Sequence, residues 1–317
     1  MIILWFLALA ISLFTLLKAA DFFIDNSVVI GNKLDIAHFV LGATVIAFGT
    51  SLPELAVGLS AIFENEPSII SGTVVGSNIS NILLISGLAI AVSSGFKVDF
   101  KKNAGPLLIF LFVTFLTSYF LWDNEYSLTE GIISVILLVS YITYIVIFPG
   151  AEDEEDEEDT FSYKTVLILF VSGLFIWLGA KYVVVSITKI AEILEIAEDI
   201  ISLTVVALGT SLPELAVTIS AAKKKKYGIV LGNVIGSNIF NSLCVLGIPT
   251  VIGYYTGHLY TISDAVFTSF SIPLMLLATI LLFILSLLKS TPKLFGYLFV
   301  ALYIFFIVGT FLNISIL

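Results

Sequence analysis

The amino-acid sequence predicts an all-α integral membrane protein with ten transmembrane helices, built as two inverted five-helix repeats whose broken helices 2, 3, 7 and 8 form the core. Of its 317 residues, 59% are hydrophobic and 12% are charged, and the mean hydropathy is +1.11. Soluble domains average about 25% charged residues, so this composition indicates a chain that lies in lipid. Two further observations predict the repeats: a nine-residue segment occurs twice, and an acidic run separates the copies.

Apolar stretches long enough to cross a bilayer, about 20 residues each as helix, recur along the whole chain. The first, from Met1 to Leu17, lacks the basic start of a secretory signal, so we expect it to be retained as a span. The predicted spans cover residues 2–24, 37–62, 69–93, 104–122, 127–148, 163–186, 197–221, 227–253, 263–287 and 295–315.

The spans divide into a first repeat at residues 1–150 and a second at residues 163–317, joined by an acidic cytoplasmic linker at residues 151–162. The linker contains eight consecutive carboxylates, Glu152 to Asp159. Runs of like charge repel and stay solvated, so we expect a disordered tether, with a low-affinity calcium sensor as the alternative. The formal net charge of -10 argues against nucleic-acid binding.

All fourteen basic residues are lysines, so the positive-inside rule can be applied by counting them. With the N-terminus outside, twelve fall on the cytoplasmic side and only Lys181 and Lys189 fall outside. The twelve are Lys18, Lys33, Lys97, Lys101, Lys102, Lys164, Lys223, Lys224, Lys225, Lys226, Lys289 and Lys293. The sequence therefore predicts a multi-pass protein of the cell membrane with both termini outside.

The internal repeat is the most informative feature of the sequence. The segment GTSLPELAV at Gly49–Val57 reappears unchanged at Gly209–Val217, 160 residues later. The same offset relates the segment GSNI at 76–79 to that at 236–239, and Asn81 to Asn241. Because each half has an odd number of spans, equivalent spans cross the bilayer in opposite directions. Such inverted repeats are typical of secondary transporters, whose sites lie near the midplane between the repeats.

Both copies contain a proline inside an apolar span. Proline removes one helical hydrogen bond, so Pro53 and Pro213 are expected to free backbone carbonyls near Gly49 and Gly209. Irregular backbone at membrane depth is tolerated only inside protein or beside a cavity. A bound cation is the expected partner of these carbonyls.

Polar side chains accompany each proline at helical spacing, and they define a candidate metal site. Carboxylate, hydroxyl and amide oxygens are hard ligands suited to calcium or sodium. The predicted ligand side chains are Thr50, Ser51, Glu54, Ser77 and Asn81 in the first half, and Thr210, Ser211, Glu214, Ser237 and Asn241 in the second. His38 and His258 are far apart and Cys244 is the only cysteine, so imidazole or thiolate metal sites and disulfides within the chain are not expected.

Two glutamates within apolar spans need a reason, since a charge at the bilayer centre costs about 3 kcal/mol on insertion scales. The alternative to ion binding is that Glu54 and Glu214 are protonated and serve packing. The hydroxyl and amide residues have the alternative of bonding between helices. The glycines of the repeated motifs, at positions 72, 76, 232 and 236, are expected to let helices approach closely.

The charge of this pair suggests a mechanism. Two ionised glutamates close together repel unless cations or a proton compensate them, which penalises an empty carrier. If only loaded forms change between inward-facing and outward-facing states, the protein exchanges ions without leaking them.

Two copies of Gly-Thr-Ser-Leu-Pro-Glu, each followed by Gly-Ser-Asn-Ile-x-Asn, resemble the α-repeats of the calcium:cation antiporter superfamily, in particular those of prokaryotic sodium/calcium exchangers. The resemblance implies that Glu54 and Glu214 bind calcium with help from Thr50 and Thr210. It also implies that sodium sites on either side use the four serines named above and the carbonyls of Ala47 and Ala207, and that spans one and six slide to open alternate faces.

One position departs from the pattern, because archaeal relatives can have an aspartate where this chain has Asn241. The ion stoichiometry therefore stays open. The sequence predicts a sodium/calcium antiporter, functional as a monomer, with no cofactor beyond the transported Ca²⁺ and Na⁺. A proton/calcium or potassium-dependent exchanger is the alternative, then a cation channel. An enzyme is disfavoured, because no histidine pair or serine with a basic partner occurs in the apolar segments.

Overall fold

The structure is a computed structural model, and it describes residues 2–63, 68–93, 100–123, 125–148, 161–194, 207–257, 267–288 and 290–312. Within these ranges the chain is helical and forms no β-strand. The first half contains α1(Ile2–Lys33), α2(His38–Leu41), η1(Gly42–Ile46), α3(Ala47–Thr50), α4(Leu52–Phe63), α5(Ser68–Ile79), η2(Ser80–Ile85), α6(Ser86–Val92), α7(Phe100–Phe120) and α8(Leu128–Ile147). The second contains α9(Tyr163–Ile193), α11(Ala207–Thr210), α12(Leu212–Lys223), α13(Tyr227–Phe240), η4(Asn241–Val245), α14(Gly247–Thr256), η5(Phe267–Ser271), α15(Ile272–Ser286) and α16(Lys293–Phe311), where η marks a π-helical segment.

Seven of the described helices are long and apolar enough to cross a membrane, and the bent pair 38–50 and 52–63 makes an eighth. The chain is therefore a multi-pass membrane protein, as its composition predicts. The predicted span at 197–221 lies partly outside the described residues, so the count of ten spans stays a prediction. Residues 151–160 of the acidic linker and His258 also lie outside them.

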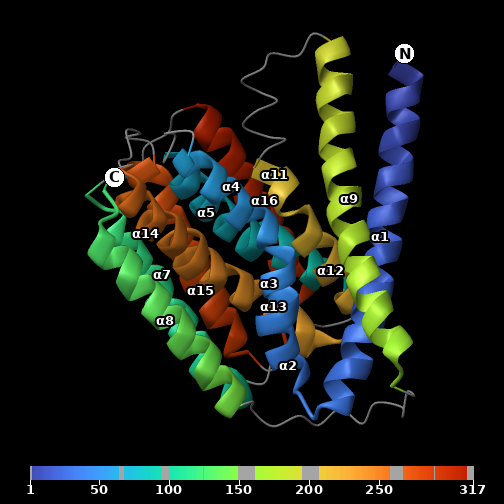
Figure 1. Cartoon of the computed structure of the whole chain (residues 1–317), viewed down its shortest axis with the longest axis horizontal. Helices are drawn as coiled ribbons and strands as arrows, with labels where there is room; N and C mark the ends of the chain where they lie inside the picture. Colours follow the sequence, from blue (N-terminus) through green and yellow to red (C-terminus); the bar gives the residue numbers. More distant parts are fainter. Residues whose placement is uncertain are drawn as a thin grey trace.

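Helices α1 and α9 stand side by side at one flank of the molecule and run in opposite directions (Figure 1). Gly179 of α9 lies against Leu16 of α1, and Gly173 lies against Phe23, so residue numbers rise along one helix as they fall along the other. These helices begin the two halves, and an antiparallel course is what inverted repeats require of such a pair.

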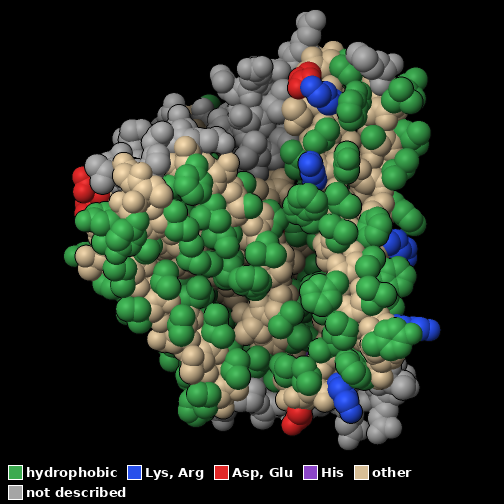
Figure 2. Space-filling view, in the orientation of Figure 1, with side chains coloured by type: hydrophobic (Ala, Val, Ile, Leu, Met, Phe, Trp, Pro, Cys, Tyr) green, Lys and Arg blue, Asp and Glu red, His purple; other side chains and the backbone are tan. Residues whose placement is uncertain are grey.

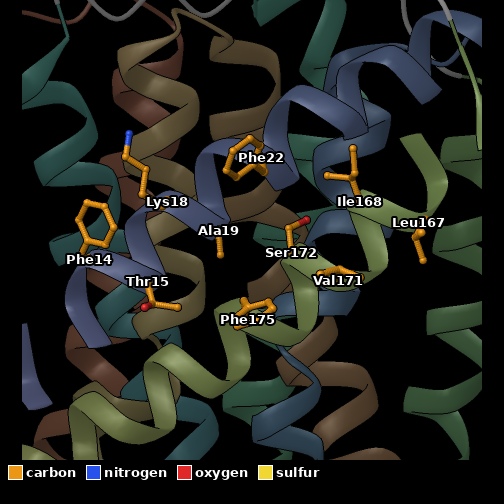
Figure 3. A pocket seen from close by; sticks show the side chains of 10 residues that line it. All are labelled: Phe14, Thr15, Lys18, Ala19, Phe22, Leu167, Ile168, Val171, Ser172 and Phe175. Atoms are coloured by element: carbon orange, nitrogen blue, oxygen red, sulfur yellow. The ribbon is translucent and has the colours of Figure 1, made fainter. Parts of the chain in front are cut away.

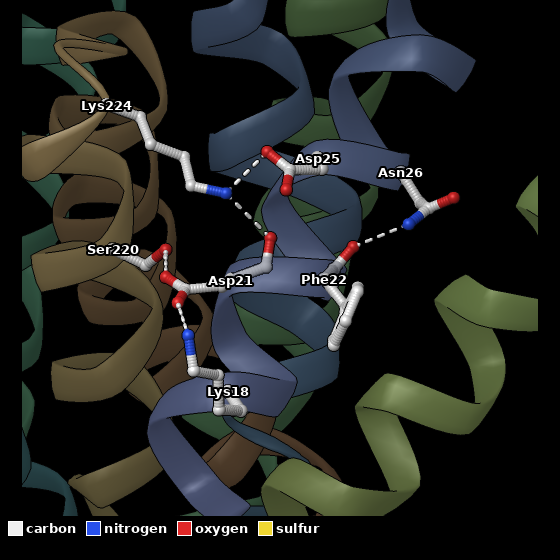
Figure 4. A network of polar contacts seen from close by, with 7 residues as sticks. All are labelled: Lys18, Asp21, Phe22, Asp25, Asn26, Ser220 and Lys224. Carbon is white, nitrogen blue, oxygen red and sulfur yellow. Dashed lines mark hydrogen bonds and ion pairs between the residues drawn. The ribbon is translucent and has the colours of Figure 1, made fainter. Parts of the chain in front are cut away.

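The first helix is longer than predicted, since α1 continues to Lys33 instead of ending at residue 24. The polar residues beyond residue 24 do not end the helix, because they find partners. Asn26 donates to the carbonyl of Phe22 at 2.8 Å, and Asp25 pairs with Lys224 (Figure 4). Helix α9 likewise continues past the predicted end at residue 186 to Ile193.

A polar network joins α1 to the end of α12 (Figure 4). Ser220 donates to a carboxylate oxygen of Asp21 at 2.7 Å, and Lys224 donates to the backbone carbonyl of Asp21 at 2.9 Å. Lys18 lies 3.8 Å from the same carboxylate. The flanking helix is thus tied to the helix that carries Glu214.

The two halves repeat their local structure as well as their sequence. In each, a four-residue helix ends at a threonine, a serine forms a turn, and a new helix begins just before the proline. Ser51 has φ -91° and ψ 8°, and Ser211 has φ -86° and ψ 3°. The break predicted from Pro53 and Pro213 is therefore present in both halves.

Burial separates a central core from a lipid-facing shell. The apolar window of Tyr227–Thr256 is 100% buried, whereas that of Ile2–Lys33 is only 17% buried. Apolar side chains cover much of the face in Figure 2, and Phe170 on α9 is 73% exposed. Exposure of such side chains is costly in water and neutral in lipid.

Among the four motif glycines, close packing is described for Gly232 and Gly236. A Cβ at Gly236 would lie 2.6 Å from backbone atoms of Ala43, and Gly232 meets the backbone of Phe39 and Ala43. This confirms the predicted close approach of α13 to α2 and η1. For Gly72 and Gly76 the prediction is not tested: no described atom lies within 4 Å of a Cβ at either position, and residues 199–203, which correspond to the partners of Gly232 and Gly236, lie outside the described residues.

Candidate ion-binding site

The two glutamates of the repeated motif occupy equivalent positions at the starts of α4 and α12. Glu54 is 0% exposed and Glu214 is 1% exposed, and the carboxylates are close enough to interact electrostatically. Each follows its serine turn, so the helix break aims both side chains into the core.

Hydroxyl groups from opposite halves cross over to these carboxylates. Ser51 donates to Glu214 at 2.8 Å, and Thr50 lies close to the same carboxylate. Thr210 lies close to Glu54 in return, and Ser77 donates to Glu54 at 3.5 Å. The structure therefore brings six of the predicted residues into one cluster shared by both repeats.

The remaining predicted side chains are buried close to this cluster. Asn81 lies in η2, which packs against α12, and Asn241 lies in η4, which packs against α4. Ser211 forms the turn before α12, and Ser237 lies on α13 and is 0% exposed.

Many polar atoms of this region are buried without a hydrogen-bond partner among the described residues. Leaving a buried polar group unpaired costs about 1–3 kcal/mol, so such a concentration needs an explanation. The unpartnered atoms are Glu54 Oε2, Glu214 Oε2, Ser211 Oγ, Ser237 Oγ, and both side-chain polar atoms of Asn81 and of Asn241. Their chemistry fits Na⁺ or Ca²⁺, which take oxygen ligands.

The two backbone carbonyls predicted as ligands belong to Ala47 and Ala207, which lie at matching positions in the two halves. The carbonyl of Ala47 accepts from the amide of Ser51 at 3.0 Å and from the Thr50 hydroxyl at 3.3 Å. Ala207 begins α11, which places it at the position in the second half that matches Ala47.

Sequence reasoning missed the π-helical segments of the site. The turns η2 and η4 begin directly after the Gly-Ser-Asn-Ile motifs or one residue later, and they carry Asn81 and Asn241. A π-helical turn inserts one extra residue and is frequent at functional sites. No residue type signals this insertion, although the density of serine and asparagine marks the region.

Sequence reasoning also missed a hydrogen bond between the two halves. Asn78 donates to the hydroxyl of Ser242 at 3.0 Å, whereas its counterpart Asn238 donates to a carbonyl of its own helix at 2.6 Å. The repeated Gly-Ser-Asn-Ile motif was the signal that could have indicated Asn78.

Two cavities lie beside α9. One of about 240 Å³ lies between α9 and the helix breaks, and its lining includes Pro53, Gly209, Thr210, Trp177 and Lys181. Thr210 is the one hydroxyl residue in this lining.

The other cavity, of about 530 Å³, lies between α1 and α9 (Figure 3). Its ten lining residues are largely apolar, with Lys18 the one charged side chain among them. Its only side-chain oxygens are the hydroxyls of Thr15 and Ser172, and no carboxylate lines it.

Other metal chemistries find little support in the described residues. They contain no group of three or more His, Cys, Asp or Glu side chains that could hold a metal ion. His38 begins α2, and Cys244 is a buried free cysteine in η4, as expected for a packing residue.

Comparison with known proteins agrees with the residues. The profile of the sodium/calcium exchanger protein family matches residues 4–148 and 164–312. The sodium/calcium exchanger MaX1 of Methanosarcina acetivorans is 33% identical over 323 residues, covering 88% of this chain and 90% of its own. The inner membrane protein YrbG of Escherichia coli is 32% identical over 256 residues, covering 77% and 78%.

A solved structure has the same fold. The sodium-calcium exchanger NCX_Mj, soaked with Na⁺ and Sr²⁺, superposes with a TM-score of 0.84 at 31% identity, covering 98% of this chain and 99% of that chain. The family profile matches well over half of the chain, and MaX1 exceeds 30% identity over most of it. The chain therefore belongs to the sodium/calcium exchanger protein family.

Proposed function

We propose that this protein is a secondary active antiporter that exchanges sodium for calcium across the membrane by alternating access. The observation that carries the proposal is the buried cluster of two glutamates, in which Ser51 of the first repeat bonds Glu214 of the second and several polar atoms have no partner. The names of MaX1 and NCX_Mj give the same exchange for those proteins.

The ions bind between Glu54 and Glu214, with Thr50 and Thr210 supporting calcium at the centre. Ser51, Ser77, Ser211 and Ser237, the amides of Asn81 and Asn241, and the carbonyls of Ala47 and Ala207 supply the remaining ligands. Two buried carboxylates without a cation repel each other, so the empty carrier is disfavoured from changing its facing. Exchange instead of leak follows from this penalty.

Ten spans in two inverted repeats, residues 1–150 and 163–317, place this site near the midplane. The family profile matches two stretches and skips residues 149–163, which supports a linker there. We place the protein in the cell membrane as a functional monomer, with both termini outside and the linker in the cytoplasm.

The alternation uses α1 and α9 as a moving pair. This pair is antiparallel and lies beside the core, and the two site threonines differ in burial. Thr50 is 3% exposed, whereas Thr210 is only partly buried. Such asymmetry suits one of two states of a symmetric carrier.

The test is calcium uptake into proteoliposomes under an outward sodium gradient, compared with outward proton and potassium gradients. Sodium-driven uptake that is lost in Glu54→Gln and in Glu214→Gln supports the proposal. Glu130→Gln is the matched control, because Glu130 caps α8 in an exposed capping box away from the site.

The other possible outcomes would indicate a different transport function or would refute the site. Uptake driven by protons alone, or sodium-driven uptake that requires potassium, would replace sodium/calcium exchange by one of the alternative exchangers. Flux that persists without a counter-ion gradient would indicate a channel. Wild-type flux in both glutamine variants would refute the site.

A further inference from the structure

One buried hydrogen bond joins the two repeats directly beside Asn241, a proposed ion ligand. Asn78, near the end of α5, is 1% exposed, and its amide nitrogen donates to the hydroxyl of Ser242 at 3.0 Å. The same nitrogen lies 3.9 Å from the sulfur of Met275 on α15. Ser242 is also 1% exposed and follows Asn241 in the π-helical turn η4. Asn78 therefore contacts the turn that carries a ligand, although it is not itself among the proposed ligands.

This bond follows from a sequence difference between the halves. The 160-residue offset relates Asn78 to Asn238 and Ser242 to Ile82. Asn238 donates to the carbonyl of Val234 in its own helix at 2.6 Å. The side chain of Ile82 has no group that could accept a hydrogen bond. The turn η4 thus has a bond from the opposite repeat that the matching turn η2 does not receive from Asn238.

The side chain of Asn241 depends on this turn for its position. Asn241 is 0% exposed, and neither its amide oxygen nor its amide nitrogen has a hydrogen-bond partner among the described residues. Its backbone carbonyl accepts from the amide of Leu246, five residues later, at 3.3 Å, which is the π-type bond of the turn. Such turns are rare and their geometry is set by local packing. The next residue, Ser242, is the point at which a side chain of the opposite repeat holds the turn.

We propose that Asn78 is a positioning residue: through Ser242 it fixes the turn η4 and so holds the amide of Asn241 toward the bound cations. The inference rests on the proposed function, in which Asn241 and Asn81 are ligands, and it goes beyond that function by giving a role to a residue outside the ligand set. Asn78 itself touches no ion. The role is specific to Asn241, because Asn81 lies in η2.

Two variants remove the bond, one from each side. Ser242→Ala deletes only the hydroxyl, and Asn78→Leu removes the donor at similar side-chain size. Ser118→Ala is the matched control, because Ser118 is a buried serine whose hydroxyl donates to the carbonyl of Thr114 in its own helix at 2.8 Å. Ser242→Ala carries the test by itself if Asn78→Leu does not fold.

The decisive measurement is a double-mutant cycle. Each variant is made in wild type, in Asn241→Ala and in Asn81→Ala. The half-saturating concentrations of Ca²⁺ and Na⁺ are measured for exchange in proteoliposomes, and calorimetry in detergent gives Ca²⁺ affinity independently of transport. Melting temperatures of the same samples record stability separately. Residues that act as one unit give non-additive changes, whereas independent residues give additive ones.

In wild type, Ser242→Ala and Asn78→Leu are each expected to weaken Ca²⁺ binding about five-fold, the equivalent of one hydrogen bond. In Asn241→Ala they should change it by less than about two-fold, because the side chain that they position is gone. In Asn81→Ala the five-fold loss should remain, and Ser118→Ala should bind Ca²⁺ as wild type does.

A merely structural role would give a different pattern. Equal losses of affinity in the Asn241→Ala and Asn81→Ala backgrounds, unchanged affinity in Ser242→Ala, or a similar loss in Ser118→Ala would overturn the inference. So would an Asn241→Ala variant that binds Ca²⁺ as tightly as wild type. Absence of sodium-driven uptake in wild type would instead contradict the proposed function, and the calorimetric cycle would still decide the role of Asn78.

Discussion

The contrast between Gly236 and Gly76, which occupy the same motif position, predicts opposite effects of one methyl group. A Cβ at Gly236 would lie 2.6 Å from the Cα and carbonyl oxygen of Ala43 and 2.8 Å from its carbonyl carbon. All three are backbone atoms, so no side-chain rotation can relieve the overlap. At Gly76 no described atom lies within 4 Å.

The magnitude follows from this geometry. Ordinary contact begins near 3.4 Å, so Gly236→Ala must separate α13 from η1 by up to about 0.8 Å. Overpacking costs about 1–3 kcal/mol, and a contact with backbone on both sides belongs at the upper end. Replacing a helical glycine by alanine returns about 1 kcal/mol of helix propensity. We therefore expect a net loss of about 2 kcal/mol for Gly236→Ala, and no loss for Gly76→Ala.

The assay is the melting temperature of detergent-solubilised protein, followed by size-exclusion chromatography after heating. For a chain of 317 residues, an unfolding entropy of about 2.1 cal/mol/K per residue means that a loss of about 2 kcal/mol lowers the melting temperature by roughly 3 °C. Gly76→Ala, the matched control, should melt at or slightly above the wild-type temperature. Equal melting of the two variants would show that α13 and η1 are not in close contact, and the argument would fail.

Three smaller perturbations test other contacts. Ser51→Ala removes the 2.8 Å hydrogen bond to Glu214 and should raise the half-saturating sodium concentration roughly ten-fold, since a bond to a charged group contributes about 1.5 kcal/mol; an unchanged sodium dependence of calcium uptake would contradict this. Asp25→Asn breaks the ion pair with Lys224, but the carboxylate is 60% exposed, so a loss of at most about 1 kcal/mol is expected in thermal melting, and a much larger loss would show that the pair holds α1 in place. Replacing the carboxylates at 152–159 by serine and glycine should leave uptake unchanged if the run is a tether, whereas a shifted calcium dependence would favour a sensor.

Much of the fold was predictable because lipid imposes a simple rule on sequence. Helices that face lipid must be apolar along their whole length, so span positions can be read from composition. The exact ends of the helices were harder to predict. Helix α1 continues through Asp25 and Asn26, because Asp25 pairs with Lys224 and Asn26 bonds to the helix backbone. Such partners belong to tertiary structure, which a local pattern does not contain.

The positions of the glutamates were equally predictable, because a buried charge and a repeated proline leave few explanations. The turns at Ser51 and Ser211 have nearly the same backbone angles, which follows from the identical sequence around them. The π-helical segments were not predictable, because the extra residue is stabilised by packing between helices and not by residue type.

The two halves also differ in the burial of equivalent residues, and local sequence does not explain this difference. Thr50 and Thr210 lie in identical nine-residue segments, yet Thr50 is 3% exposed and Thr210 is only partly buried, beside a cavity of about 240 Å³. Identical sequences have equal preferences for both environments, so local sequence cannot decide which copy is closed. A single conformation of a two-state molecule must break this symmetry, and exchanging the environments of the two copies would generate the opposite state from the same contacts.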